Sequence, residues 1–382
     1  MTIAYFGNTL NPHQAYVADA LFELTGGNYI YVETVPPVQD NKSGGKLQMQ
    51  RQYILRAYES ADAQKEALQI SRDADVALFG AYSLEYEVER MRTTGRLAFE
   101  VSERWLKRGW MNLLSPRLLK NMWYYHTLFH NKPLYKLCSS AYGAEDQYRL
   151  HSFKGRCYKW GYFTKVDSDF VVEAREQDAS TSGIISLMWC ARFLKLKHPE
   201  LPVQLASRLK EKGYQFTIDM FGDGEEFDRT KSIIKELGVE DCVKLSGNLP
   251  NEEILNEMRN HSIFLFTSDR NEGWGAVLNE AMSNGCAVVA SDSIGSVPFL
   301  VEDKTNGLIF KSENIDSLSE KVMYLMDHPN ERNQMAISAY NTMRDVWSPA
   351  RAAQNLLQLI EDLKAGNDSS IPEGPCSKAQ PI

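Results

Sequence analysis

Short apolar runs alternate with amphipathic stretches along most of the chain. Runs of consecutive apolar residues predict buried strands, and we expect such strands at residues 2–6, 29–35, 76–80, 97–101, 157–163, 184–190, 216–221, 243–246, 263–266 and 286–290. Apolar positions between them fit helices at residues 15–24, 54–71, 83–93, 202–212, 252–260, 318–326, 331–346 and 350–364. The alternation of strand and helix indicates an α/β protein built on parallel sheets.

The clearest local pattern lies at residues 261–310. An apolar strand leads through a polar loop into the sequence Glu-Gly-Trp-Gly at 272–275, where a helical pattern begins. Asn284 and Gly285 end that helix before the next strand, so the segment predicts one right-handed βαβ unit. Glycines let backbone N–H groups approach a ligand, and a helix start carries partial positive charge. We therefore expect a phosphate site there.

Glu280 is the unusual residue of this unit, because it lies inside the helix beside the apolar stripe. A buried carboxylate costs several kcal/mol unless a group donates hydrogen bonds to it. The vicinal hydroxyls of a ribose would do so, and Glu272, at the mouth of the helix, could bind the other end of a sugar nucleotide. Two alternatives stay open: Glu280 caps a neighbouring loop, and Glu272 is a solvated loop residue.

Glu272 and Glu280, with Gly273 and Gly275 between them, resemble the E-x7-E motif of the family-4 glycosyltransferases of the GT-B fold. The resemblance is strong over residues 184–310 and weaker in the first half of the chain. It implies two Rossmann-like doubly wound domains that face a cleft, with a C-terminal helix that crosses back to the first domain. It also implies that Glu280 binds the donor ribose and that Glu272 contacts the donor sugar.

This fold predicts the domain boundaries. We expect an acceptor-side domain at residues 1–170, an acidic linker at 171–183 and a nucleotide-sugar-binding domain at 184–345. The returning helix should then occupy 346–364, and the tail 365–382, with its Gly, Asn, Ser and Pro, is predicted to be disordered.

Two cations follow the strand at 184–190, namely Arg192 and Lys197. They match the Gly-Arg and Lys-Gly pattern of the resembled family, although Ala191 and His198 replace its glycines. Arginine and lysine at this place would hold a pyrophosphate. The predicted catalytic residues are Arg192, Lys197 and Glu272. The predicted substrate-binding residues are Glu280, Gly273, Trp274, Gly275, Ala276, Gly222, Asn248, Leu249, His13 and Glu103.

The last two of these residues come from the first half of the chain. His13 lies in the loop 7–14 after the first strand, where doubly wound folds bind ligands. It binds an acceptor or handles a proton in the cleft, or it is an ordinary polar residue at a helix start. Glu103 follows the strand 97–101 at a place where the resembled family often has histidine. It contacts the donor or the acceptor, or it is a residue that forms an ion pair with Arg104 or lies in the first turn of a helix.

Composition narrows the classes of function. The length of 382 residues suits two domains, and the net charge of −8 argues against a general nucleic-acid binder. There is no apolar run of about 18 residues and no visible signal peptide, which predicts a cytoplasmic protein. The six cysteines lack metal spacing, and no Asp-x-Asp motif suggests a divalent-ion site, so we expect no metal ion and no cofactor.

The segment 105–136 combines tryptophans, tyrosines and leucines with lysines and arginines. It could meet anionic lipid headgroups as a peripheral surface, or its aromatics could form the core of the first domain.

Together with the resemblance, these observations favour a retaining, metal-independent glycosyltransferase. It would move a sugar from a nucleotide donor, with UDP implied by the resemblance, to a glycan or lipid-linked acceptor in surface polysaccharide synthesis. The alternatives are a UDP-sugar epimerase on the same fold and a non-catalytic nucleotide-sugar-binding subunit.

Overall fold

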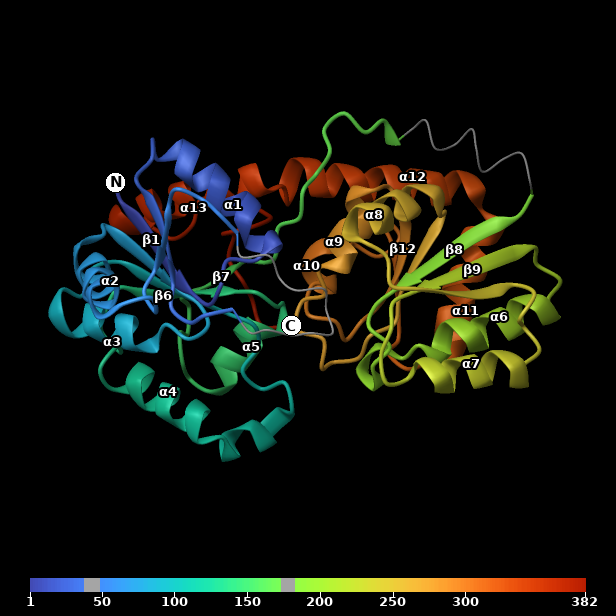
Figure 1. Cartoon of the computed structure of the whole chain (residues 1–382), viewed down its shortest axis with the longest axis horizontal. Helices are drawn as coiled ribbons and strands as arrows, with labels where there is room; N and C mark the ends of the chain where they lie inside the picture. The colour runs from blue at the N-terminus through green and yellow to red at the C-terminus, as the bar shows by residue number, and fades with distance from the viewer. Residues whose placement is uncertain (38–48, 173–182) are drawn as a thin grey trace. The chain divides into compact units, whose positions relative to one another are not determined.

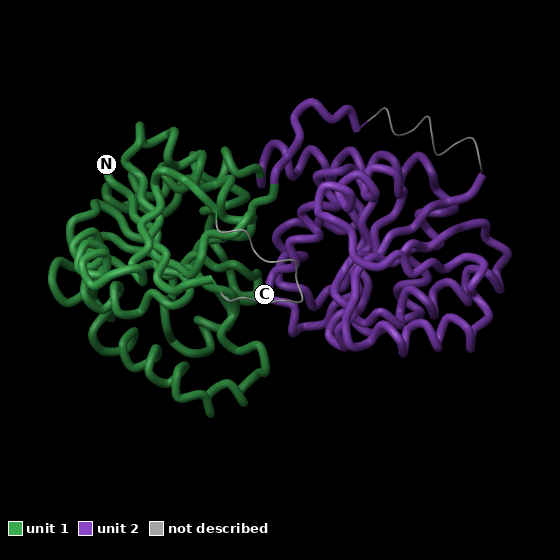
Figure 2. Tube along the Cα trace, viewed as in Figure 1, with its two compact units in different colours: residues 1–164, 348–382 green, residues 165–347 purple. Residues whose placement is uncertain are grey.

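The computed structural model describes residues 1–37, 49–172 and 183–382. The chain divides into two compact units, shown in green and purple in Figure 2. Unit 1 comprises residues 1–164 and 348–382, and unit 2 comprises residues 165–347. Each unit contains one parallel sheet with helices on its faces (Figure 1), which confirms the predicted fold class. Most of the predicted linker at 171–183 lies outside the described residues.

Unit 1 is built on a seven-stranded sheet with the order β3-β2-β1-β4-β5-β6-β7. Its elements are β1 (Ile3–Gly7), α1 (Pro12–Leu24), β2 (Tyr29–Glu33), β3 (Ile54–Arg56), α2 (Ala61–Asp73), β4 (Val76–Phe79), α3 (Leu84–Thr93), β5 (Ala98–Ser102), η1 (Gly109–Leu114), α4 (Pro116–His126), β6 (Leu134–Cys138), α5 (Tyr142–Arg149), β7 (Cys157–Lys159) and α13 (Pro349–Lys364). The strand β1 pairs in parallel with β2 and with β4. Every residue of β1 is buried, as expected for a central strand of a parallel sheet.

The predicted helix at 54–71 is wrong in its first third. Residues Ile54–Arg56 form β3, which pairs with β2, and helix α2 begins only at Ala61. Ser60 marks that start, because its side-chain oxygen accepts a hydrogen bond from the Ala63 N–H at 3.0 Å. A three-residue strand is too short to show a period of its own, so the sequence pattern merged it with the helix.

The predicted disorder of the tail 365–382 is also wrong. Its backbone pairs with the edge strand β7: Cys376 N–H donates to Lys159 O at 2.7 Å, and Lys159 N–H donates to Ser377 O at 2.8 Å. The Tyr158 hydroxyl donates to Asp368 Oδ1 at 2.8 Å, and Cys376 is fully buried. An edge strand offers unpaired backbone groups, and this partner orders a segment whose composition alone indicates disorder.

Helix α13 belongs to unit 1, as the predicted returning helix should. It packs against α1 through an apolar stripe that includes Leu356, Leu359 and Ile360. Ser348 caps its N-terminus, where the side-chain oxygen accepts a hydrogen bond from the Arg351 N–H at 3.3 Å.

Unit 2 is built on a six-stranded sheet with the order β10-β9-β8-β11-β12-β13. Its elements are β8 (Ile185–Cys190), η3 (Lys195–Lys197), α6 (Glu200–Glu211), β9 (Phe216–Phe221), α7 (Phe227–Glu236), β10 (Val243–Gly247), α8 (Asn251–Asn260), β11 (Ile263–Phe266), α9 (Val277–Ser283), β12 (Ala287–Ser291), α10 (Val297–Leu300), β13 (Leu308–Phe310), α11 (Ile315–Asp327), α12 (Pro329–Asn341) and η4 (Thr342–Val346). Helices α6, α7 and α11 cover one face of the sheet, and α8, α9 and α12 cover the other (Figure 1).

The strand order reverses beside the first strand of each unit: β1 lies between β2 and β4, and β8 lies between β9 and β11. In doubly wound sheets, ligands bind outside the carboxyl ends of the strands at such a reversal. The topology therefore predicts ligand sites at the loops after β1 and β4 in unit 1 and at the loops after β8 and β11 in unit 2. No helix in the described part of the chain is long and apolar enough to cross a membrane.

Candidate functional site

The loops after β8 and β11 are bonded to each other in unit 2. The Thr267 hydroxyl donates to Lys197 O at 2.7 Å and accepts from the buried indole of Trp189 at 2.9 Å. The Asp269 N–H donates to Leu196 O at 2.9 Å. These bonds fix the loop that carries Lys197 against the loop that carries Glu272. We call the surface formed by the loops after β8, β9, β10 and β11 the strand-end site.

Lys197 and Glu272 form an ion pair within the strand-end site. The Lys197 ammonium donates to the Glu272 carboxylate, and the Ser268 hydroxyl donates to the same carboxylate at 3.1 Å. Their side chains are 13% and 14% exposed, so the pair is largely shielded from water but still reachable. The sequence predicted each residue separately, and the structure brings the two charges together. Ser268 was missed, because a serine in a polar loop carries no distinguishing signal.

Two glycines let the loops approach this closely. Gly222, after β9, has φ +126°, and a Cβ there would lie 1.9 Å from Ala191 O. Gly275, after β11, has φ +82°, and a Cβ there would lie 2.2 Å from Cζ of Phe266. A side chain at position 222 would displace the backbone of Ala191, and one at position 275 would displace the buried Phe266 ring, so both glycines shape the site.

Glu280 lies in the first turn of α9, half-buried near the end of β8. Burial raises the pKa of its carboxyl to about 6, opposed by the Asn251 amide, which donates to Oε1 at 3.2 Å. Burial, and then the charge of Glu280, raise the pKa of the Cys190 thiol, whereas the charge of Lys197 lowers it. Glu280 and Lys197 therefore both act on the end of β8. Asn251, at the start of α8, is a second residue that the sequence did not indicate.

The prediction that Trp274 binds substrate fails for its side chain. The indole is 1% exposed and packs against Phe299 and Trp347 in the core. Its Nε1–H donates to Asn279 Oδ1 at 2.8 Å. A tryptophan between glycines suggested a ligand contact, but the ring fills the space under the loop. The main chain remains the only part of Trp274 that can contact a ligand.

The other predicted residues of unit 2 lie in or next to the loops that form the strand-end site. Gly273 is buried, and Ala276 precedes the first turn of α9. Asn248 is exposed and Leu249 half-buried in the loop between β10 and α8, so that loop carries both of them next to Asn251. Arg192 is exposed, and its guanidinium makes no hydrogen bond or ion pair with any described residue. It is therefore available to an anionic ligand.

Three side chains could offer ligand atoms to a metal ion near the strand-end site. One atom each of His198, Asp269 and Glu313 lie within 4.8 Å of one another. The His198 Nδ1 lies 2.8 Å from the Glu200 carboxylate, and this hydrogen bond raises the pKa of His198. A metal ion needs the neutral imidazole, whereas this environment stabilises the protonated one. The other ring nitrogen, Nε2, lies 3.5 Å from the Asp269 carboxylate and makes no hydrogen bond with a described residue.

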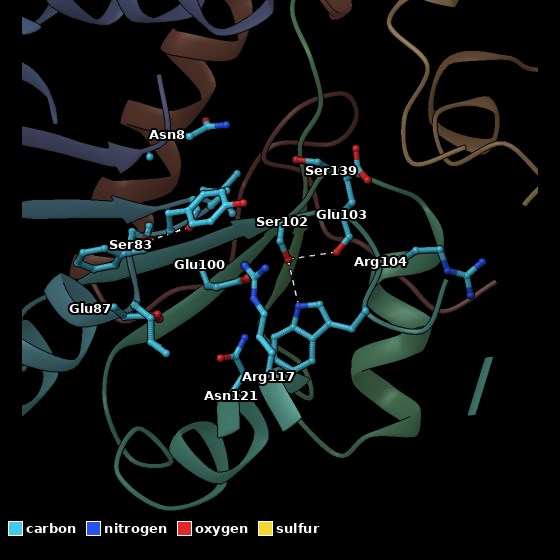
Figure 3. A pocket seen from close by; sticks show the side chains of 18 of the residues that line it. Asn8, Ser83, Glu87, Glu100, Ser102, Glu103, Arg104, Arg117, Asn121 and Ser139 are labelled. Carbon is cyan, nitrogen blue, oxygen red and sulfur yellow. Dashed lines mark hydrogen bonds between the residues drawn. The ribbon is translucent and has the colours of Figure 1, made fainter. Parts of the chain in front are cut away.

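Unit 1 has a cavity of about 1180 Å³ at its own strand ends. It is lined by the ends of β1, β4 and β5 and by helix α4, from which Arg117 and Asn121 point inward (Figure 3). The loop 7–14 borders this cavity, because Gly7, Asn8 and Asn11 line its wall, whereas His13 is not among the lining residues. The cavity is large enough for a sugar with its linkage partner.

Buried acidic groups line this cavity. Burial, and then the neighbouring Glu100, raise the pKa of Glu87 to about 8, and the Tyr125 hydroxyl lies 3.0 Å from the Glu87 carboxyl. Glu100 pairs with the fully buried Lys136, which also donates to Ser102 Oγ at 2.7 Å. The sequence did not predict either carboxyl, since each follows an apolar pattern that predicts core.

His13 and Glu103 are brought together through Tyr162. The Tyr162 hydroxyl donates to Glu103 Oε1 at 2.9 Å, and its ring is stacked on His13 with centroids 6.0 Å apart. Lys107 donates to the other carboxylate oxygen of Glu103. Arg104 instead pairs with the buried Asp146 at 3.0 Å, so the alternative of a Glu103–Arg104 pair is excluded. Glu103 and Tyr162 line the cavity.

Comparison with known proteins gives a family match. Residues 173–342 match the model of "Glycosyl transferases group 1". A poly(glycerol-phosphate) alpha-glucosyltransferase of Bacillus subtilis (strain 168) is 30% identical over 175 residues, which cover 45% of this chain and 25% of that protein. The amylovoran biosynthesis glycosyltransferase AmsK of Erwinia amylovora is 26% identical over 184 residues, 47% of this chain and 45% of that protein. The chain thus spans less than half the length of these curated relatives.

Solved structures extend the likeness to the whole fold. Anabaena Alr3699/HepE in complex with UDP superposes with a TM-score of 0.68 at 15% identity, covering 94% of this chain and 100% of that chain. A glycosyltransferase from Rickettsia africae ESF-5 gives a TM-score of 0.70 at 14% identity, covering 95% and 98%. These matches confirm the predicted GT-B fold.

Proposed function

We propose that this chain, whose second unit matches the group 1 glycosyl transferases, is a retaining glycosyltransferase. It transfers a sugar from a nucleoside-diphosphate donor to a glycan or lipid-linked acceptor in surface polysaccharide synthesis. The observation that carries the proposal is the Lys197–Glu272 ion pair at the strand-end site, with Arg192 in the loop after β8 and Glu280 in helix α9. Retention of configuration follows from the family resemblance.

The leaving diphosphate needs positive charge as the bond to the sugar breaks. Arg192 and Lys197 supply it from the loop after β8, where Glu272 holds Lys197 and Arg192 is exposed, so the diphosphate is stabilised without a metal ion. Glu272 holds Lys197 in position and contacts the donor sugar. When the diphosphate approaches, the Lys197 ammonium is shared between it and Glu272, because lysine has three donors.

Glu280 binds the ribose of the donor. With a pKa of about 6, its carboxyl is mostly ionised at neutral pH and can accept hydrogen bonds from two vicinal hydroxyls. Asn251 already donates to one of its oxygens and keeps the carboxylate oriented. The nucleobase then lies toward Asn248 and Leu249. The bound UDP of the Anabaena neighbour supports a UDP-linked donor.

The acceptor enters the cavity of unit 1. Glu103, held by Tyr162 and Lys107, is the carboxylate best placed to orient an acceptor hydroxyl. Glu87 is neutral at pH 7 and can donate as well as accept a hydrogen bond. We place the reaction in the cytoplasm, which agrees with the absence of a disulfide among the cysteines of the described residues.

A donor screen tests the proposal. The purified protein is titrated calorimetrically with UDP and with other nucleoside diphosphates, and release of the nucleotide from the matching nucleotide sugars is followed with and without acceptor. We expect tight binding of one nucleoside diphosphate and acceptor-dependent release. Isomerisation of a UDP-sugar without acceptor would instead establish the epimerase, and binding without any turnover would leave a nucleotide-sugar-binding subunit.

A further inference from the structure

The outer surface of η1 and α4 in unit 1 is unusually apolar. Five large hydrophobic side chains lie exposed within this short segment, each between 50% and 82% exposed: Trp110, Met111, Leu114, Leu119 and Trp123. Large apolar side chains exposed together in one short segment indicate an interaction site. We call it the η1–α4 surface. Tryptophan is the side chain most typical of the interface between a bilayer and water.

The segment around this surface carries only positive charge. From Arg104 to Ala144 the sequence contains seven Lys or Arg residues and no Asp or Glu, in a chain whose net charge is −8. Arg108 is exposed next to Trp110 and Met111 in the sequence, and the exposed Lys120 lies between Leu119 and the cavity, whose wall it also lines. An apolar face with basic neighbours is complementary to an anionic lipid headgroup layer.

Helix α4 separates this surface from the cavity. Leu119 and Trp123 are four residues apart and share one face, whereas Arg117 and Asn121 share the opposite face and point into the cavity (Figure 3). The other aromatics of the segment, such as Trp105 and Phe129, pack inside the unit. The segment therefore contains both core aromatics and an outward apolar face, and only the outward face is free to bind.

A second copy of this chain is a poor occupant of the surface. A symmetric pairing would bring Arg108 and Lys120 of one copy close to the same cations of the other, and no acidic residue of the segment could neutralise them. A bilayer of anionic lipids meets both requirements at once, because it offers an apolar interior beneath a layer of negative charge.

We propose that the η1–α4 surface docks on an anionic lipid bilayer and that the acceptor is held in that bilayer. The inference rests on the proposed transferase function, because that function requires an acceptor substrate. It favours a lipid-linked acceptor over a free glycan. The tryptophans insert at the headgroup level, the cations contact lipid phosphates, and the inner face of α4 stays turned to the cavity that takes the sugar end. The cavity thus opens beside the membrane without any spanning helix.

Vesicle binding tests this docking. The full chain is sedimented with vesicles of phosphatidylcholine alone and with vesicles in which phosphatidylglycerol replaces about a third of the lipid. We expect at least roughly tenfold more binding to the anionic vesicles and loss of most of it when the salt concentration rises from about 0.1 to about 0.5 M. The double variant Trp110→Ser with Trp123→Ser should bind roughly tenfold less tightly or worse.

Control variants change similar exposed residues elsewhere on unit 1, so that an effect specific to the η1–α4 surface can be recognised. Leu24→Ser with Tyr148→Ser removes exposed apolar groups elsewhere on unit 1 and should bind vesicles like the wild type. For charge, Arg108→Glu should weaken binding, whereas Lys65→Glu on the exposed side of α2 should not. Thermal unfolding checks that each variant is folded.

Two outcomes overturn the proposal: no sedimentation with anionic vesicles at low salt, or equal binding by the tryptophan double variant. A dimer in solution that this double variant dissociates, without vesicle binding, would assign the surface to a second copy instead. Calorimetry with UDP separates this failure from failure of the transferase function, because donor binding in unit 2 should be the same in every η1–α4 variant.

Discussion

The two units share one strand topology but differ in how their strand ends are filled. In unit 2 the loops after β8 and β11 are bonded together, and their opposite charges, Lys197 and Glu272, are paired. In unit 1 the loops stand apart around a cavity of about 1180 Å³, and its acidic side chains lie deep in the wall. In doubly wound sheets the topology determines where a ligand would bind, and the loops determine what kind of ligand fits there.

Among the changes that test this difference between the units, Lys197→Ala should have the largest effect on activity. Loss of the cation removes stabilisation of the leaving diphosphate and leaves the Glu272 carboxylate without its ion-pair partner. We expect kcat/KM to fall by roughly 10²-fold or more, measured by release of nucleoside diphosphate. Arg192→Ala should have an effect of the same order. Lys195→Ala, an exposed lysine of the same loop, is the control, and an equal loss there would remove the specific role of Lys197.

The closeness of the unit 2 loops can be tested with Gly275→Ala. The new methyl group would overlap the Phe266 ring at a backbone φ of +82°. We expect the free energy of unfolding to fall by roughly 2–4 kcal/mol in urea denaturation. Gly238→Ala has a similar φ, +63°, with open space around it, and should cost only about 1 kcal/mol. Equal losses would mean that backbone strain alone acts at Gly275.

Glu280→Gln tests whether the half-buried carboxylate of unit 2 binds the donor. The amide keeps the shape of the carboxylate but loses its charge, so affinity for the correct nucleotide should fall by about 1–3 kcal/mol in calorimetry. In the wild type, affinity should rise as pH increases through about 6, because the ionised form binds. The exposed Glu253→Gln on α8 should change neither quantity. Unchanged affinity in a folded Glu280→Gln protein would remove this residue from the site.

Glu87 is the buried carboxyl group of unit 1 that we compare with Glu280. A change at Glu87 should alter the stability of the folded chain rather than donor binding. The Glu87 pKa of about 8 in the folded chain lies above the ordinary value of 4.5, so the folded state holds a proton that the unfolded state releases. This stability is fully present below pH 4.5 and is lost as pH rises through 8, at up to about 1.4 kcal/mol per pH unit. Glu87→Gln should flatten this dependence in thermal unfolding, whereas Glu85→Gln, exposed on the same helix, should not.

Removal of divalent metal ions by a chelator should have the smallest effect on turnover. If fixed cations stabilise the leaving group, EDTA should change turnover by less than about twofold. The cluster of His198, Asp269 and Glu313 is the place where a divalent ion would act if this expectation fails. Strict dependence on Mg²⁺ or Mn²⁺ would contradict the metal-free mechanism, and loss of that dependence in Asp269→Asn would locate the ion.

The sequence was more informative about unit 2 than about unit 1. Glu272, Glu280 and the two cations stand at fixed places relative to strands and turns, so a local pattern contains them. The partners Ser268 and Asn251 were missed, because only folding brings them to these carboxylates. In unit 1 the cavity is formed by residues from many separate segments, and Glu87 and Glu100 lie within patterns that predict core. Composition also misled at the tail, where pairing with β7 supplies the order.

The return of residues 348–382 to unit 1 has a consequence for synthesis of the chain. Domains usually become complete in the order in which the ribosome makes them. Here unit 2 has its whole sequence once Trp347 has left the ribosome, whereas unit 1 still lacks α13 and the segment that pairs with β7. The unit that begins first is thus completed last. Until then its β7 edge and the apolar surface of α1 are open to chaperones, or to any strand that pairs there first.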